Sequence, residues 1–241
     1  MPQTKLYNFT ANYQNKREYH SLKREIFTQG IYEPSLEIGN SNLIILDIGA
    51  HIGLSTLYFK WLYPNAKIIA IEPNPENFAI LEQNIFENNL EDIETYNLAL
   101  DTKEGKAQLY VDKDDEWQSN SSLLENSWTG EEKTKAIVVK TQTLSYFIDL
   151  IFEQSNSLAI LKMDIEGLES EILFSAGEKL KVFNELLIEF HPTGKQNINK
   201  LIKHLESLNF KVNLEKKNKE VKDRYHRGLT IIKAINIAEI I

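Results

Sequence analysis

The sequence predicts an α/β protein with a mostly parallel β-sheet and helices on both faces. Short apolar runs such as residues 43–48 and 67–72 recur along the chain, and such runs are typical of strands that are buried on both faces. Segments with helical periodicity separate these runs. Strand, helix, strand, helix and strand follow one another within residues 43–98, an order typical of a parallel sheet with right-handed crossovers.

The first half of the predicted sheet is the most regular part of the chain. A turn that contains glycines follows the first strand and leads into a helix at about residues 54–62, which Pro64 ends. Pro75 suits the first turn of the next helix, which follows the second strand. The third strand is expected at residues 93–98. The apolar face of the helix before it comprises Phe78, Leu81, Ile85 and Leu90.

The middle of the chain is less regular and is predicted to form an insertion. Residues 108–111 and 136–140 alternate or run apolar, as expected of two strands in a hairpin-like unit. An acidic loop, residues 112–132, lies between them and contains Trp117 and Trp128. Long loops inside compact domains are usually functional or disordered, and the two Trp residues favour a lid or a substrate contact.

The alternation of helices and strands resumes after the insertion. We expect helices at 143–152, 168–175 and 197–208, and strands at 158–164, 185–190, 210–214 and 229–235. The charged run 215–227 is interpreted as a solvated loop between the last two strands. These elements predict one domain over residues 42–241, with an inserted loop at about 105–140. Residues 1–41 are predicted to be an irregular extension with one helix at 21–29, which ends at Gly30.

The composition limits the chemistry of the protein. The 241 residues include 35 Asp and Glu against 27 Lys and Arg, a net charge of −8 that argues against a nucleic-acid partner. The chain has no Cys, which excludes disulfides, thiolate zinc sites and a thiol nucleophile. We find no signal-peptide pattern and no apolar run near the ~20 residues of a membrane span, and we expect a cytoplasmic protein. The oligomeric state stays open, with a homodimer as one option.

The strongest local signal is a turn between a strand and a helix, Asp47-Ile48-Gly49-Ala50-His51-Ile52-Gly53. Its glycines allow a sharp bend and a close approach of a ligand to the main chain, and the helix start offers free N–H groups. His51 stands where the dinucleotide fingerprint G-x-G-x-x-G requires its second glycine, so a pyrophosphate is disfavoured. An acid at Asp47 suits a ligand that carries an amine or a sulfonium. His51 either contacts that ligand or only fills the turn.

Two more signals lie at the ends of the next two predicted strands. Glu72 ends the second strand, where a carboxylate can accept hydrogen bonds from both hydroxyls of a ribose, and Asn74 follows it closely. Asn97-Leu98-Ala99 ends the third strand, where an adenine would lie. Ligands in open α/β sheets bind at the carboxyl edge of the strands, so the three signals together predict a nucleoside-like ligand.

These residues resemble a known family. Asp47-x-Gly49-x-x-x-Gly53 followed by Glu72-Pro73 is similar to the nucleotide-binding half of class I S-adenosylmethionine-dependent methyltransferases. Lys162-x-Asp164-x-Glu166-Gly167-x-Glu169 resembles the corresponding segment of the FkbM-type members, and it is the most specific part of a similarity that covers roughly residues 25–235. Further support comes from Asn97-x-Ala99, Ser121-Ser122-Leu123 and Ile188-Glu189-Phe190-His191.

The resemblance implies a Rossmann-like sheet of seven strands with an antiparallel terminal strand. It also implies S-adenosylmethionine as cofactor and, as in better-known members, methyl transfer to a hydroxyl oxygen of a sugar, polyketide or related small molecule. The family often has Thr-Leu-Asp before the helix that precedes strand four, whereas this chain has Thr143-Leu144-Ser145, which puts the identity of the acceptor in doubt. The expected cofactor-binding residues are Asp47, Gly49, His51, Gly53, Glu72, Asn74, Ala99, Ser122 and Asp164.

The catalytic candidates lie at the ends of strands four and five. Because a sulfonium is already an activated methyl donor, the protein has to align the acceptor and supply a general base. His191, Asp164 and Glu166 are the candidates for that base. The same residues, with Glu189, form an oxygen-rich set that suits magnesium or manganese, a metal that the sequence allows but does not favour. Tyr32 is expected to reach over the cofactor.

Three other functions stay open from the sequence. The first is a nucleic-acid or amine methyltransferase, but amine-directed members usually carry a Pro-Pro-aromatic segment after strand four, where this chain has Asp164-Ile165-Glu166-Gly167, and the net charge of −8 opposes a nucleic-acid substrate. An NAD(P)-dependent oxidoreductase shares the strand–helix–strand–acid pattern, although the middle glycine of its fingerprint and a Tyr-x-x-x-Lys dyad are missing. A module that binds the cofactor without turnover is the third alternative, and the presence of both Asp164 and His191 argues against it.

Overall fold

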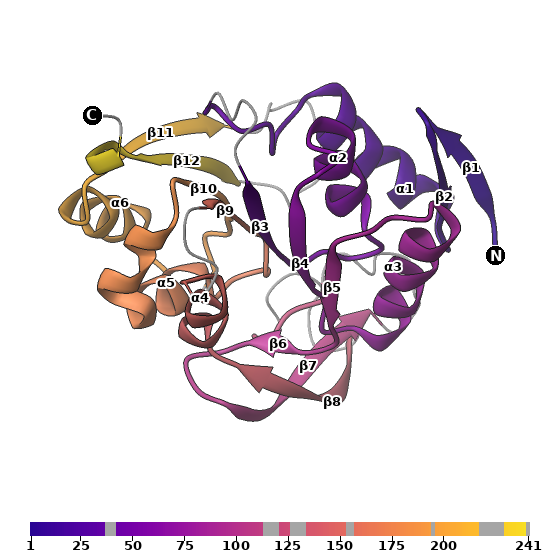
Figure 1. Cartoon of the computed structure of the whole chain (residues 1–241). Coiled ribbons are helices and arrows are strands. Elements are labelled where there is room, and N and C mark those ends of the chain that lie inside the picture. The colour runs from indigo at the N-terminus through magenta and orange to yellow at the C-terminus, as the bar shows by residue number, and fades with distance from the viewer. Residues whose placement is uncertain are drawn as a thin grey trace.

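A computed structural model describes residues 1–36, 42–112, 121–125, 134–152, 157–193, 196–216 and 229–239. In this part of the chain a sheet of seven strands has the order β11-β12-β10-β9-β3-β4-β5 (Figure 1). Its strands are β3 (Leu43–Ile48), β4 (Lys67–Ile71), β5 (Ile93–Tyr96), β9 (Leu158–Met163), β10 (Glu185–Phe190), β11 (Phe210–Lys216) and β12 (Thr230–Asn236).

The sheet is parallel except at β12. The pairs β3–β4, β4–β5, β3–β9 and β9–β10 are parallel, whereas β12 pairs antiparallel with both β10 and β11. The prediction of a mostly parallel Rossmann-like sheet with an antiparallel terminal strand is therefore confirmed. β12 is last in the chain but lies inside the sheet, between β10 and the edge strand β11.

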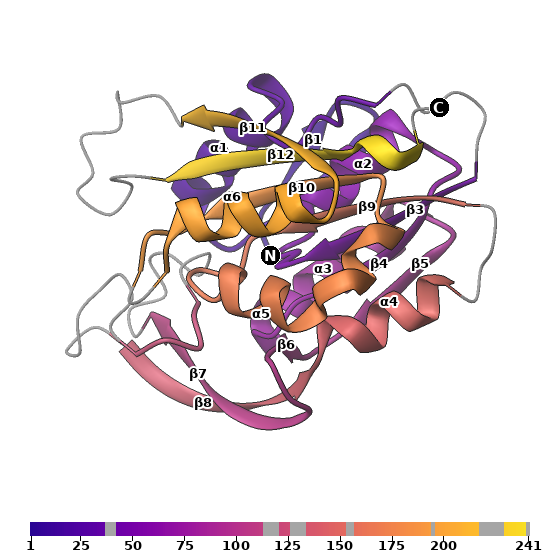
Figure 2. The same ribbon diagram turned by 90° about the vertical axis from the view of Figure 1, so that its left-hand side faces the viewer.

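Helices cover both faces of the sheet (Figure 1). Alternate residues of β3 point to opposite faces, so Ile45 packs with one helix group and Leu46 with the other. Figure 2 looks onto the face that α4, α5 and α6 cover. The helices are α2 (Leu54–Leu62) and α3 (Pro75–Glu87) on one face, and α4 (Leu144–Phe152), α5 (Glu169–Ala176) and α6 (Ile198–Ser207) on the other.

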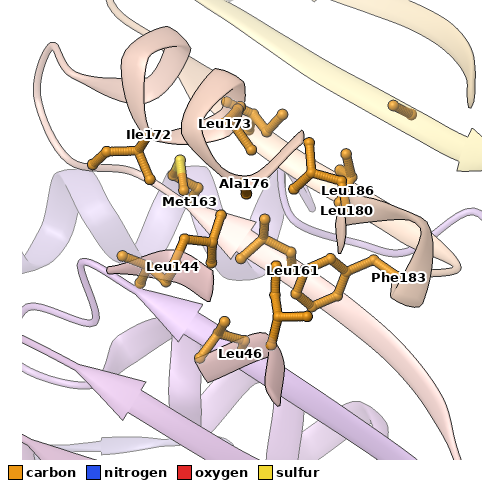
Figure 3. Packing of buried hydrophobic residues seen from close by; sticks show 14 of the residues in the cluster. Leu46, Leu144, Leu161, Met163, Ile172, Leu173, Ala176, Leu180, Phe183 and Leu186 are labelled. Carbon is orange, nitrogen blue, oxygen red and sulfur yellow. The ribbon is translucent and has the colours of Figure 1, made fainter. Parts of the chain in front are cut away.

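The larger core lies under α4, α5 and α6. Figure 3 shows Leu46 and Leu161 of the sheet in the same cluster as Leu144 of α4 and Leu173 of α5, with Leu161 between Leu46 and Leu173. All of these side chains are buried, and burial of apolar surface at ~25 cal/mol per Å² is the main stabilising contribution to such a layer. Both faces of the central strands are therefore covered, which explains why those strands are apolar at nearly every position.

The predicted insertion forms a small sheet of its own. β7 (Gly105–Asp112) and β8 (Thr134–Gln142) pair antiparallel over their whole length, as expected for a hairpin-like unit. The short strand β6 (Ala99–Leu100) joins β8 in parallel. Ser121 to Glu125 lie within the described residues, whereas Trp117, Trp128 and the charged residues 217–227 lie outside them.

The N-terminal extension contains more structure than the sequence analysis expected. β1 (Gln3–Leu6) and β2 (Phe9–Asn12) form a hairpin that was not predicted. The predicted helix 21–29 is wrong in its start: α1 (Lys16–Lys23) begins earlier and continues as a π-helix (Arg24–Thr28). The reason is Asn15, whose side chain accepts hydrogen bonds from the N–H groups of Arg17 and Glu18 and so caps the helix.

Within the described residues, no helix is both long and apolar enough to cross a bilayer.

Candidate active site

A cavity opens at the carboxyl ends of β3, β4, β9 and β10. Its empty volume is about 1210 Å³, a figure that includes the open mouth of the cavity. The cavity brings together most of the sequence-predicted site residues, which follow five strands far apart in the chain: β3, β4, β5, β9 and β10. These residues are Gly49, His51, Glu72, Ala99, Asp164, Glu166 and His191.

The glycine turn after β3 brings the backbone close to the end of β9. Gly49 has a φ of +72°, and a Cβ built there would lie 1.8 Å from the carbonyl oxygen of Asp164. Gly53 has a φ of +87°, and its Cβ would lie 2.7 Å from Cδ1 of Leu81 on α3. Both glycines are therefore required by the packing of the chain on itself, and only Gly49 lines the cavity.

The amides of this turn donate hydrogen bonds inside the protein. The N–H groups of Gly49 and Ala50 both donate to the carbonyl oxygen of Ile71 at 2.9 Å. The His51 N–H donates to Glu72 at 2.9 Å, and the Gly53 N–H donates to Ala50 at 2.8 Å. A dinucleotide-binding turn needs such amides for its pyrophosphate, so these contacts argue against NAD(P) as the ligand.

Asp47 lies outside the cavity lining, although it was expected to bind the cofactor. It is completely buried, and its Oδ2 accepts hydrogen bonds from the hydroxyls of Ser55 at 2.7 Å and Thr56 at 2.8 Å. Its Oδ1 lies 3.3 Å from Nζ of Lys162. The Asp47 carboxylate thus connects the start of α2 to β9 and helps to fix the glycine turn between β3 and α2.

Glu72 lines the cavity, as expected for a residue that holds a ribose. One carboxylate oxygen accepts from the N–H of His51 and the other from the N–H of Asn74, both at 2.9 Å. Asn77 adds a side-chain hydrogen bond to this carboxylate, and the remaining lone-pair capacity can serve a ligand hydroxyl. Burial raises the pKa of Glu72 to about 7, although the backbone donors oppose the shift.

Three other expected cofactor residues have different surroundings. Asn74 caps α3 by accepting from the N–H of Glu76 at 3.0 Å and is not part of the cavity lining. The hydroxyl of Ser122 donates to the carbonyl oxygen of Glu166 at 2.7 Å, which fixes the loop after β9. His51, with a φ of +52°, lines the cavity 3.8 Å from Glu18.

The end of β9 and the end of β10 carry a cluster of ionisable side chains around His191. The imidazole Nδ1 lies 2.8 Å from Glu169, and Nε2 lies 3.3 Å from Glu166. Nε2 is also 3.8 Å from Asp164 and 3.8 Å from Glu189. Four carboxyl groups therefore converge on one buried imidazole, which we call the acid–histidine cluster: Asp164, Glu166, Glu169, Glu189 and His191.

The pKa values in this cluster show how it stores protons. Burial lowers the pKa of His191, but Glu166, Glu169 and Asp164 outweigh this and raise it to about 10. Burial, with help from the other acids, raises the pKa of Glu166 to about 8. At neutral pH His191 is therefore a cation and Glu166 is largely protonated, so neither group is free to accept a further proton.

Asp164, Glu166 and His191 also meet a simple geometric condition for a metal site. Each offers one ligand atom, and these atoms all lie within 4.8 Å of one another. A metal needs the neutral imidazole, whereas His191 is held as a cation by the carboxylates around it. The proton on His191 thus competes with a metal for the same position.

The N-terminal extension supplies cavity residues that the sequence analysis missed. Leu22, Glu25 and Ile26 line the cavity next to Tyr32, which was expected to reach over the cofactor. These residues belong to no recognisable motif, because they come from α1, the π-helix and the loop after it. Only the amphipathic character of α1 could have indicated that this segment packs on the sheet.

The cavity suits S-adenosylmethionine in shape and charge. Leu98, Ala99 and Leu109 form an apolar wall beyond Glu72, suitable for an adenine. The opposite wall carries Asp164 and the rest of the acid–histidine cluster, which favours a cation such as a sulfonium. The residues present therefore fit the cofactor that the sequence predicted.

Comparison with known proteins agrees with this assignment. A methyltransferase called Methyltransferase 1, from Beauveria bassiana (strain ARSEF 2860), is 27% identical over 177 residues, which cover 68% of this chain and 69% of that protein. Methyltransferase sdnD from Sordaria araneosa is 28% identical over 206 residues, 75% of this chain and 78% of that protein. Among solved structures, a SAM-dependent methyltransferase from Agrobacterium tumefaciens has a similar fold, with a TM-score of 0.50 at 6% identity over 97% of this chain and 69% of that chain.

The family assignment comes from residues 47–212, which match the methyltransferase FkbM domain. This stretch begins at Asp47 and includes Glu72, Asp164 and His191. It covers the glycine turn, both cavity walls and the small inserted sheet. The chain therefore belongs to the FkbM family of class I S-adenosylmethionine-dependent methyltransferases.

Proposed function

We propose that this methyltransferase transfers the methyl group to a hydroxyl oxygen of a small molecule, with Asp164 as the general base. The observation that carries the proposal is the acid–histidine cluster, which opens into the same cavity as Glu72. A hydroxyl is weakly acidic and gains from a base within hydrogen-bond reach, whereas a neutral amine does not need one. A carboxyl-rich wall beside the expected position of the sulfonium therefore favours an oxygen acceptor.

Asp164 is the candidate base of the cluster because its side chain is more exposed than those of Glu166 and Glu189, so its ionisation has the lowest desolvation cost. Its side chain is 24% exposed, against 14% for Glu166 and 5% for Glu189. Ionisation costs less in a partly exposed side chain, although Oδ1 of Asp164 is itself buried and only the rest of the side chain is exposed. Glu166 and His191 hold protons at neutral pH, which leaves Asp164 to accept the proton of the acceptor hydroxyl. His191 then holds the surrounding carboxylates in place through its two ring nitrogens.

The other residues of the cavity bind and orient. Glu72 is positioned to accept from ribose hydroxyls, and the apolar wall beyond it would hold the adenine. The bound cofactor supplies an activated methyl group on a sulfonium. The cavity is a concave site lined by the strand ends and the N-terminal extension, which supports a small-molecule acceptor rather than a polymer. The oxidoreductase alternative is set aside, because the turn amides are engaged and the family is that of methyltransferases.

The experiment is an acceptor screen followed by substitution of the base. The purified protein is incubated with S-adenosylmethionine and a panel of hydroxylated sugars, polyketides and related metabolites, and release of S-adenosylhomocysteine is measured. Asp164→Asn should lower turnover ~100-fold or more and change cofactor affinity by less than about threefold. Asp149→Asn, an exposed aspartate on α4, is the matched control.

Three results would contradict the proposal. Full turnover in Asp164→Asn would move the base to another residue. Cofactor binding without S-adenosylhomocysteine release on any acceptor, including amines, would support the binding module without turnover. Release with amines alone would replace the hydroxyl by a nitrogen acceptor.

A further inference from the structure

Tyr32 connects the N-terminal extension to the acid–histidine cluster. Its side chain is 2% exposed, and its hydroxyl lies 2.9 Å from Oδ2 of Asp164 and 2.9 Å from Oε2 of Glu189. The residue lies outside the stretch 47–212 that matches the family. An element beyond the family-matched stretch thus reaches the proposed base directly.

The two contacts of the Tyr32 hydroxyl require an extra proton. A phenol has one hydrogen to donate and lone pairs to accept with, so it can donate to only one of two carboxylates. Burial raises the pKa of Tyr32 well above its usual value, and Asp164 and Glu189 add to the shift, so the hydroxyl keeps its hydrogen. The second contact is favourable only if that carboxyl group is itself protonated and donates to the phenol oxygen.

Burial decides which of the two acids carries the proton. The Glu189 side chain is 5% exposed and the Asp164 side chain is 24% exposed. Oδ1 of Asp164 is also buried, but its side chain as a whole is the more exposed, so a charge on Glu189 is the more costly of the two and a proton on Glu189 is favoured. The resulting chain runs from the Glu189 carboxyl through the Tyr32 hydroxyl to an ionised Asp164.

Other charged groups lie around this chain and do not distinguish its two ends. Nζ of Lys162 on β9 lies 5.1 Å from the centre of the Tyr32 ring. His191 on β10 lies 3.8 Å from both Asp164 and Glu189, and Glu166 lies next to His191 at 3.3 Å. From the N-terminal side, Glu25 of the π-helix also lines the cavity. The cations lie near the Asp164 end of the chain as well as near Glu189, so they do not reverse the effect of burial.

We propose that Tyr32 is a positioning residue that holds Asp164 ionised and aimed into the cavity, with the balancing proton stored on Glu189. The inference rests on the proposed function. In the step that it serves, the acceptor O–H proton passes to Asp164 while the acceptor oxygen bonds to the methyl carbon. The carbon–sulfur bond breaks, and its electron pair stays on sulfur. Tyr32 keeps its hydrogen and donates to Asp164 throughout.

The test compares Tyr32→Phe with Tyr19→Phe. Tyr19 lies on α1 of the same extension, is also buried, and its hydroxyl has no hydrogen-bond partner among the described residues. Tyr32→Phe should lower kcat at least ~10-fold with little change in the KM for the acceptor or the Kd for S-adenosylmethionine. It should also move the acid limb of the kcat–pH profile to higher pH, because ionised Asp164 loses a donor. Tyr19→Phe should leave kcat and the pH profile at parent values.

A second variant, Glu189→Gln, tests where the proton lies. It remains informative even if the Tyr32→Phe protein does not fold. Glu189→Gln mimics the protonated carboxyl, since its amide can donate to the Tyr32 oxygen. It should retain at least ~10-fold more turnover than Asp164→Asn. Equal losses in Glu189→Gln and Asp164→Asn would overturn the proton assignment. A kcat and acid limb in Tyr32→Phe equal to those of the parent would overturn the positioning role.

The two proposals fail in different ways. If the parent releases no S-adenosylhomocysteine with any hydroxyl acceptor, the proposed function fails. If the parent turns over and Tyr32→Phe behaves like Tyr19→Phe, only the inference about Tyr32 fails.

Discussion

The two walls of the cavity use carboxylates in different ways. On one side, Glu72 in the wall and Asp47 behind the cavity lining bind groups of the protein itself: two backbone amides for Glu72, and two hydroxyls and a lysine for Asp47. At the ends of β9 and β10, Asp164 and Glu189 meet other ionisable side chains. The first set of carboxylates fixes the backbone conformation, whereas the second set shares protons with neighbouring ionisable groups.

This difference follows from what each carboxylate has as a partner. Main-chain amides and hydroxyls are fixed donors, so a carboxylate that binds them becomes part of the framework. Ionisable neighbours change their own charge when a ligand enters, so their protons can be redistributed. A shared position at strand ends therefore does not by itself make an acid catalytic.

The largest expected effect is a loss of stability when Asp47 is replaced. Asp47→Asn keeps the acceptor for Ser55 and Thr56 but leaves the buried Lys162 ammonium without its carboxylate, and such a loss costs ~3–5 kcal/mol. Asp149→Asn is the matched control: Asp149 pairs with Lys179 at 2.7 Å on the surface, where a pair contributes less than ~1 kcal/mol. Urea unfolding measures both. Equal stabilities of the two variants would show that Asp47 has no framework role.

An intermediate effect concerns Glu72, which is expected to bind the ribose of the cofactor. The pKa of Glu72 is raised to about 7, so the fraction ionised grows from roughly a tenth at pH 6 to nine-tenths at pH 8. Affinity for cationic S-adenosylmethionine should rise ~10-fold over this range, as measured by calorimetry. In Glu72→Gln the rise should disappear and the affinity should stay at or below the parent's low-pH value. A rise that persists in Glu72→Gln would assign the titration to another group.

The smallest expected effect concerns metal binding by the acid–histidine cluster. Treatment with a chelator and removal of metal should change turnover by less than about twofold, because the sulfonium is already an activated methyl donor and Asp164 is the proposed base. The control is the same protein with magnesium or manganese added back. A loss of activity that either ion restores would show that Asp164, Glu166 and His191 bind a metal in the working enzyme.

The sheet and most of the cavity could be predicted from the sequence because their signals are local. Apolar runs indicated the central strands, and Gly49 and Glu72 were placed at the correct strand ends. The role of Asp47 could not be inferred, because its partners Ser55 and Lys162 are set by packing between β3, α2 and β9. The N-terminal hairpin was missed because its strands, such as Phe9–Asn12, are short and have no turn signal of the usual kind.

The sequence by itself determined the fold class, the carboxyl edge where ligands bind and the family resemblance, since strand patterns and the turn motif are properties of neighbouring residues. Only the tertiary structure decided how the acids divide between framework and chemistry. It brought Tyr32 to Asp164 and Glu189, 132 and 157 positions away along the chain. Charge states depend on burial and on partners in space, and neither can be read from residue order.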